Sequence, residues 1–104
     1  MNKKKYFASL LQEQFKNEFE DASYSMAMMN ISFKEWNRYY DILMRAIKYE
    51  VAKLQDIADF ARNLMAASVI IVTNSEHEEY LKKLKAIDTI IYVINTLEQG
   101  QIRR

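Results

Sequence analysis

The sequence contains no cysteine and no proline, and its single glycine is Gly100. Without cysteine, the chain forms neither a disulfide nor a thiolate zinc site. All-β domains need a turn about every eight to twelve residues, and doubly wound α/β domains also place glycines in their turns, so both classes lack their usual turn residues here. Long helices with few connections remain, and we predict one all-α domain over residues 1–104.

The chain also lacks an excess of charge of one sign and a long apolar run. Lys and Arg number 15 against 14 Asp and Glu, whereas nucleic-acid-binding domains usually show a clear basic excess. The longest uncharged stretches, 22–33 and 64–75, fall short of the roughly 18 residues that a membrane span requires. The apolar run at 6–11 is too short for a signal peptide. We therefore expect a cytoplasmic protein with no membrane span.

Two short polar segments carry signals for the start of a helix. Ser32 with Glu35 has the spacing of a capping box, in which the serine hydroxyl accepts a hydrogen bond from the amide three residues later. Ser75 with Glu78 repeats this spacing. Gly100 favours an end to the last helix just before it. These signals predict three helices, approximately at residues 3–29, 33–72 and 76–98.

Each predicted helix carries apolar residues at three- and four-residue steps, the spacing of one helical face. The first stripe comprises Phe7, Leu11, Phe15, Phe19, Ala22, Met26 and Met29. The second comprises Trp36, Tyr40, Leu43, Ile47, Val51, Leu54, Ala58, Ala61, Met65, Ser68 and Val72. The third comprises Tyr80, Leu84, Ile87, Ile91 and Ile94. We expect these stripes to form the core.

The predicted middle helix is too long for its neighbours to cover. At 1.5 Å per residue it reaches about 60 Å, against about 40 Å and about 35 Å for the other two. Exposed apolar surface of this kind usually marks an interface. We predict an antiparallel helical bundle with a long central helix, completed by homodimerisation or by a tight complex with another protein. A break near Arg62 or within residues 48–53 would give a monomeric four-helix bundle instead, although no Gly or Pro supports it.

Residues suited to catalysis or metal binding are scarce. His77 is the single histidine, and Tyr80 and Leu81 stand where a second ligand would be expected on a helix. Di-iron bundles use Glu-x-x-His, which is absent, and phosphate-binding loops need glycines. The chain has no thiol and no plausible Ser–His–acid arrangement. We therefore predict no enzymatic activity, no catalytic residue, no metal and no cofactor.

Tyrosines beside the stripes and a cluster of methionines are the candidate partner-binding residues. Tyrosine offers a large contact area at low entropic cost, and the flexible thioether of methionine suits adaptable binding surfaces. Each group also has a purely structural interpretation, because tyrosines often lie along a surface and methionines often close the end of a bundle. The candidates are Tyr39, Tyr49, Tyr92, Met26, Met28 and Met29.

Basic residues gather at 3–5 and at 103–104. With an unbroken middle helix, both groups would approach its acidic zone at Glu50, Asp56 and Asp59, where opposite charges attract weakly if exposed. Doubled in a dimer, the same residues are the best argument for nucleic-acid binding. The balanced net charge stands against that interpretation.

These observations favour a non-enzymatic helical module that binds a protein partner and itself. A small adaptor, inhibitor or regulator fits the size and near-neutral charge, and a bacterial source, a phage or a mobile element is compatible with them. Three alternatives stay open. The first is an immunity protein of the bacteriocin kind, to which the chain is similar only in size, helical class and Lys-rich start. The others are a nucleic-acid-associated dimer and a small virion or other structural subunit.

Overall fold

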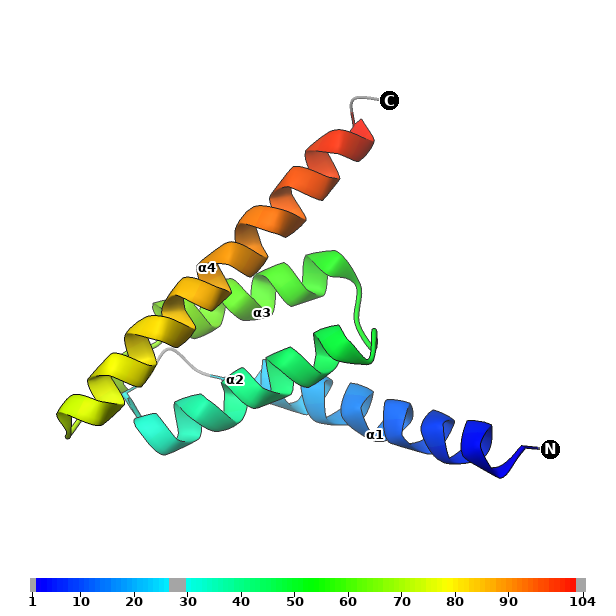
Figure 1. The fold of residues 1–104 in the computed structure, drawn as a ribbon, viewed down its shortest axis with the longest axis horizontal. Helices are drawn as coiled ribbons and strands as arrows, with labels where there is room; N and C mark the ends of the chain where they lie inside the picture. The colour runs from blue at the N-terminus through cyan, green and yellow to red at the C-terminus, as the bar shows by residue number, and fades with distance from the viewer. Residues whose placement is uncertain (1, 27–29, 103–104) are drawn as a thin grey trace.

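The structure is a computed structural model that describes residues 2–26 and 30–102, with side chains described up to Gly100. Within these residues there are four helices, α1 (Lys3–Ser25), α2 (Phe33–Lys48), α3 (Leu54–Ala66) and α4 (Asn74–Ile102) (Figure 1). Two short strands, β1 (Ile31–Ser32) and β2 (Val69–Ile70), pair in parallel. The predicted helical class is confirmed, whereas the predicted three helices with one long central helix are wrong. None of the described helices combines the length and apolarity needed to cross a membrane.

The predicted middle helix breaks after Lys48, in one of the two places where a break was considered. Glu50 has a left-handed backbone conformation, with φ of 53°. The Glu50 amide donates to the Ile47 carbonyl at 3.2 Å, and the Val51 amide donates to the Ala46 carbonyl at 3.1 Å. These two bonds satisfy carbonyls at the end of α2, as in a Schellman motif. A glycine usually marks such a helix end, and here a glutamate occupies the position.

A second departure from the predicted helix follows α3. Ala67 is extended, and the chain then pairs Val69 with Ile31 and Ile70 with Ser32 in the β1–β2 ladder. The Ile31 amide also donates to the Ser68 carbonyl at 2.9 Å. Residues 69–72 form a β-branched run, which favours extended backbone over helix. The argument for a second subunit from one continuous helix over 33–72 is therefore removed.

One predicted helix cap is confirmed and the other is misplaced by two residues. The Ser32 hydroxyl accepts from the Glu35 amide at 3.2 Å, as predicted. At the start of α4, the capping residue is Thr73 in place of Ser75. The Thr73 hydroxyl accepts from the Glu76 amide at 3.1 Å, and the Glu76 carboxylate accepts from the Thr73 amide at 3.4 Å. Both bonds of a capping box are therefore formed at the start of α4, two residues before the predicted position, and the serine cap alone is formed at the start of α2.

The limits of the outer helices also differ from the predicted limits. Helix α1 ends at Ser25, where the Met26 amide donates to the Ala22 carbonyl at 2.9 Å. Helix α4 continues through Gly100, around which a Cβ would meet no atom within 4 Å. Glycine is a poor helix former but does not by itself end a helix whose preceding turns are formed. Gly100 was therefore the wrong place to end α4.

The core lies where α2 crosses α3 and α4, and Trp36 is at its centre. Its ring is fully buried, with its centroid 4.9 Å from that of Tyr80 on α4. The Trp36 indole Nε1 donates to the Leu64 carbonyl of α3 at 3.0 Å, which satisfies the one polar atom of the ring. The largest fully buried side chains, from α2, α3 and α4, are Trp36, Phe60, Leu43, Leu64 and Ile87.

The predicted first stripe is confirmed toward the end of α1, where Phe19, Ala22 and Met26 are buried. Its first member, Phe7, is exposed, and Met29 lies outside the described residues. On α4, Ile87 and Ile94 are buried and the other stripe members are half-buried. On the predicted middle helix the stripe becomes irregular from Ile47 onward, because the Glu50 turn resets the helical phase. Buried members of that stripe are Trp36, Leu43, Ala58 and Ala61. Exposed members are Ile47, Leu54, Met65, Ser68 and Val72.

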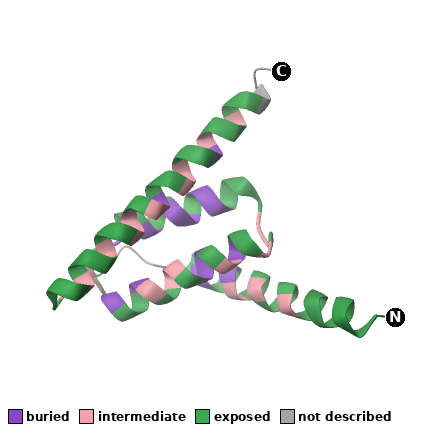
Figure 2. Ribbon diagram, viewed as in Figure 1, coloured by how far each residue is buried: buried purple, intermediate pink, exposed green. Residues whose placement is uncertain are grey.

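Two helix halves extend beyond this core. Figure 1 shows the first half of α1 and the second half of α4 pointing away from α2 and α3 in different directions. The described residues from 2 to 10 are all exposed, and exposed residues dominate the second half of α4 (Figure 2). The molecule is flat, with extents of 49 × 39 × 23 Å. These two helix halves therefore leave most of their surface uncovered within the chain.

Candidate interaction surfaces

An apolar groove lies between the α2–α3 turn and the second half of α4. Its volume is about 480 Å³. Buried side chains of α2, α3 and α4, including Ala46, form its floor, and Glu50 brings a charge to its edge. Four aliphatic side chains form its exposed walls, namely Ile47, Leu54, Val93 and Leu97, with exposures of 37%, 43%, 47% and 50%. The groove therefore combines exposed hydrophobic surface with a hollow shape.

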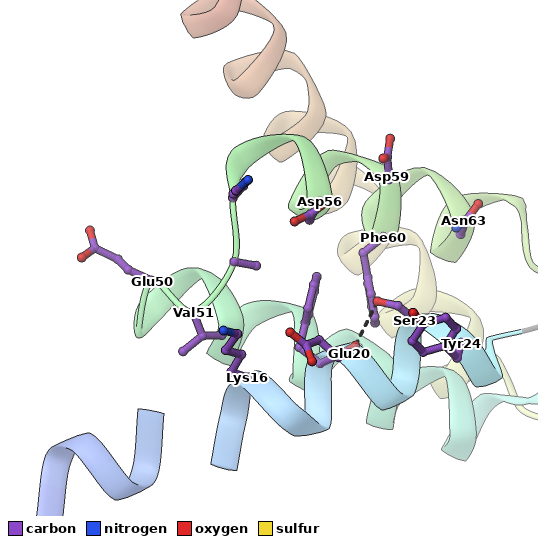
Figure 3. A pocket seen from close by; sticks show the side chains of 13 residues that line it. Lys16, Glu20, Ser23, Tyr24, Glu50, Val51, Asp56, Asp59, Phe60 and Asn63 are labelled. Carbon is purple, nitrogen blue, oxygen red and sulfur yellow. Dashed lines mark hydrogen bonds between the residues drawn. The ribbon is translucent and has the colours of Figure 1, made fainter. Parts of the chain in front are cut away.

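An acidic cleft of about 880 Å³ separates α1 from α3 (Figure 3). Helix α1 packs mainly on α2, and α3 packs on α2 and α4, so α1 and α3 meet only through a few side chains. Phe19 of α1 stacks on Phe60 of α3 with ring centroids 4.8 Å apart, and this pair forms an apolar part of the cleft wall. Four carboxylates line the cleft against two lysines, namely Glu20, Glu50, Asp56 and Asp59 against Lys16 and Lys53.

The carboxylates of the cleft are only partly neutralised by the chain itself. Asp59 accepts from Arg62 at 3.4 Å and from Gln55 at 3.1 Å, both on its own helix. Across the described part of the chain, no ion pair involves Glu20 or Asp56. Four carboxylates against two lysines leave the lining with an excess of negative charge, which favours a cation entering the cleft. The cleft therefore has a negative potential over an apolar patch.

A separate ion-pair cluster joins α1 to α2 beside the cleft. The Arg45 guanidinium contacts Glu18 of α1 at 2.9 Å and Asp41 of α2 at 3.0 Å, and it lies 5.2 Å from the centroid of the Phe15 ring. Burial lowers the pKa of Arg45, but the hydrogen bonds and charges of Glu18 and Asp41 outweigh burial, so its pKa is raised. The cluster fixes the angle between the two helices and keeps its charges satisfied within the chain.

The predicted partner-binding residues are scattered. Met26 is buried in the core, Tyr39 is half-buried against it, and Tyr49 is half-buried with its ring 4.7 Å from that of Phe15. Tyr92 exposes 71% of its surface on α4 and lies outside the groove and the cleft. Met28 and Met29 lie outside the described residues. The structure brings no two of these residues together on the groove or the cleft, and their role in binding stays a prediction.

The one histidine and the acidic residues form no evident metal site. His77 is exposed in the first turn of α4. Among the residues that the structure describes, no group of three His, Asp or Glu side chains is placed to hold a metal ion. Burial raises the pKa of the Tyr80 phenol, whose ring packs on Trp36 in the core. This perturbed group belongs to the packing of the core.

Reasoning from the sequence missed most residues of both surfaces. It assigned Leu54 and Ile47 to the core stripe of the predicted middle helix, whereas both line the groove. One signal in the sequence could have indicated the groove. The second half of α4 has apolar residues on more than one face, so its apolar surface is wider than a single packed face requires. Comparison with family models, curated proteins and solved structures finds no match to this chain.

Proposed function

We propose that this protein is a non-enzymatic helical interaction module, and that its groove binds the apolar face of one helix from a protein partner. The observation that carries the proposal is the set of four exposed aliphatic side chains around one hollow, Ile47, Leu54, Val93 and Leu97. Soluble monomers rarely leave a large contiguous apolar patch open to water unless a ligand or another chain covers it.

The shape of the groove fits a helix better than an extended strand. Its two walls are the α2–α3 turn and α4, and Figure 1 shows them diverging toward the C-terminal end of α4. An extended strand gains affinity by pairing with an exposed sheet edge, and neither the α2–α3 turn nor α4 offers one. A helix with apolar residues at positions i, i+3 or i+4, and i+7 places one apolar face along such walls. Glu50 favours a basic residue at one end of that helix.

A small adaptor, inhibitor or regulator is the role that this surface supports. The groove walls carry no cluster of Lys or Arg, so the groove offers nothing for a phosphate backbone to bind. The absence of cysteine is compatible with a reducing cytoplasm. Self-association through a second surface is compatible with this role.

Site-specific photo-crosslinking tests the groove. A photoreactive phenylalanine analogue is placed at Val93, and the crosslinked partner and its contact segment are identified by mass spectrometry. We expect the contact segment to be an amphipathic helix, and a synthetic peptide of that segment to bind the protein in solution. Leu97→Glu should weaken peptide binding by about tenfold or more, because it places a charge on the apolar wall.

Leu81→Glu is the matched control for this experiment. Leu81 is also an exposed leucine of α4, with 51% exposure, and it does not line the groove. Peptide affinity should be unchanged in this variant. If both variants weaken binding equally, the groove is not the binding site. If the contact segment is not helical, the groove does not bind a helix.

A further inference from the structure

The first turns of α1 form an unpartnered helix that is both basic and apolar. Lys3, Lys4 and Lys5 are followed by Tyr6, Phe7 and Leu10, whose exposures are 55%, 63% and 47%. The first hydrogen bond that ties α1 to another element comes later, from the Gln12 side chain to the Tyr49 carbonyl at 3.1 Å. An isolated helix of this length is marginal in water, and one with exposed aromatic residues gains stability when another surface covers it.

The acidic cleft has the complementary character. It offers four carboxylates over the apolar contact of Phe19 with Phe60, and Tyr24 on its rim is 92% exposed. In the chain itself these two features do not meet. Figure 1 shows the start of α1 pointing away from α3, and no ion pair among the described residues involves residues 3–5. The predicted approach of residues 3–5 to Asp56 and Asp59 therefore does not occur within one molecule.

We propose that residues 3–11 of α1 from a second copy of this chain occupy the acidic cleft, and that the exchange is reciprocal. The part of α1 that lines the cleft runs from Lys16 to Tyr24. Segments 3–11 and 16–24 each span about 12 Å at 1.5 Å per residue. Antiparallel pairing of two α1 helices about a twofold axis between residues 13 and 14 places each segment beside the other.

In this register a single twofold rotation places a segment in the cleft of each copy, so the assembly closes as a dimer. An interface of this kind uses the same surface patch on both copies, as twofold interfaces do. In each copy Lys3, Lys4 and Lys5 bring positive charge toward the cleft carboxylates, including Asp56 and Asp59 of α3. Figure 3 shows both aspartates on the α3 side and Glu20 on the α1 side.

A second copy is the occupant favoured by the charges on the chain. The cleft requires a segment that is cationic and partly aromatic, and residues 3–11 supply both properties on a helix that its own molecule leaves uncovered. The groove of the proposed function is a different surface, lined by α2, α3 and α4, so it stays open in this dimer. Failure of one proposal therefore leaves the other standing.

A charge exchange between two variants tests this interface. In the first variant Lys3, Lys4 and Lys5 are each replaced with Glu, and in the second Asp56 and Asp59 are each replaced with Lys. All five residues are exposed, so the fold should be kept, and circular dichroism checks this. Sedimentation equilibrium measures dimer dissociation constants for each protein and for their equimolar mixture, at about 50 mM and about 500 mM salt.

The expected pattern is specific to the reciprocal interface. The wild type should dimerise more tightly at low salt, and each variant alone should have a dissociation constant raised by about tenfold or more. The mixture should recover a dimer, because only the heterodimer places opposite charges in both clefts. The control replaces Lys34, Lys82 and Lys85 with Glu, which changes the net charge as much as the first variant does but on residues outside the cleft, and its dimer should be unaffected.

Three results would overturn the proposal. The first is a wild type that stays monomeric at low salt up to several hundred micromolar, which would leave a basic segment of another protein as the cleft's occupant. The second is a dimer that both variants retain, which would place the interface elsewhere. The third is a mixture that fails to restore association, or a wild type that forms open polymers in place of a closed dimer.

Discussion

The two ends of the molecule differ in how their helices are held together. At the closed end, where α2 and α4 begin and α3 finishes, Phe33, Trp36 and Tyr80 pack within 6.3 Å of one another between ring centroids. The β1–β2 ladder and two helix caps fix the backbone there. At the open end α4 diverges from α2 and α3 (Figure 1), and the groove lies between the α2–α3 turn and α4.

This difference indicates a division of roles along the helices. Covered aromatic residues at the closed end contribute to the free energy of folding whether or not a partner is present. Aliphatic and aromatic residues at the open end contribute little until another chain covers them, because hydrophobic stabilisation follows the area removed from water. Substitutions at different places along the helices should therefore differ in their effect on the free energy of unfolding. Urea denaturation measures this free energy at protein concentrations well below the dissociation constant of any dimer.

The largest effect is expected at Trp36. Trp36→Ala removes the largest fully buried side chain of the closed end and leaves the Leu64 carbonyl without its indole donor. We expect a loss of about 3–5 kcal/mol, a large share of the stability of a small domain. Circular dichroism should follow the urea transition, since Trp36 is the only tryptophan and its fluorescence is lost. A loss below about 1 kcal/mol would mean that the closed end does not hold the fold.

Two phenylalanines of α1 offer a matched comparison of a covered and an uncovered side chain. Phe19 is 4% exposed against Phe60, whereas Phe7 is 63% exposed on the uncovered start of the helix. Phe19→Ala should therefore cost about 3 kcal/mol, and Phe7→Ala should stay within about 0.5 kcal/mol. Equal losses in the two variants would show that the start of α1 packs on its own chain. At high concentration Phe7→Ala should instead weaken the proposed dimer.

The parts of the fold that could be predicted from the sequence are those with local signals. The Ser32 cap follows from a spacing of three residues, and the stripe of α4 from regular apolar steps within one continuous helix. The β1–β2 ladder could not be predicted, because it joins Ile31 to Val69, which are separated in the sequence by both α2 and α3. Such pairing depends on how α2 and α3 fold back on each other.

The groove and the cleft depend on the turn at Glu50 in the same way. With the helix continued, Ile47 and Leu54 share one face and read as core residues. With the turn, both lie on the groove wall, and Glu50 itself lines the groove and the cleft. The turn was hard to predict because no glycine marks it, and a left-handed backbone at a glutamate is uncommon.

The smallest expected effect tests this turn directly. A non-glycine residue in the left-handed conformation destabilises the folded state by about 1–2 kcal/mol. Glycine avoids this strain, but it loses more conformational entropy on folding, so the net gain is smaller. Glu50→Gly should therefore stabilise the protein by about 0.5–1 kcal/mol relative to Glu50→Ala. Both variants remove the same carboxylate from the end of α2, where it opposes the helix dipole, so their difference isolates the backbone contribution. Equal stability in the two variants would indicate that φ of residue 50 is not left-handed in solution, and α2 would then continue toward α3 as the longer helix that the apolar stripe predicted.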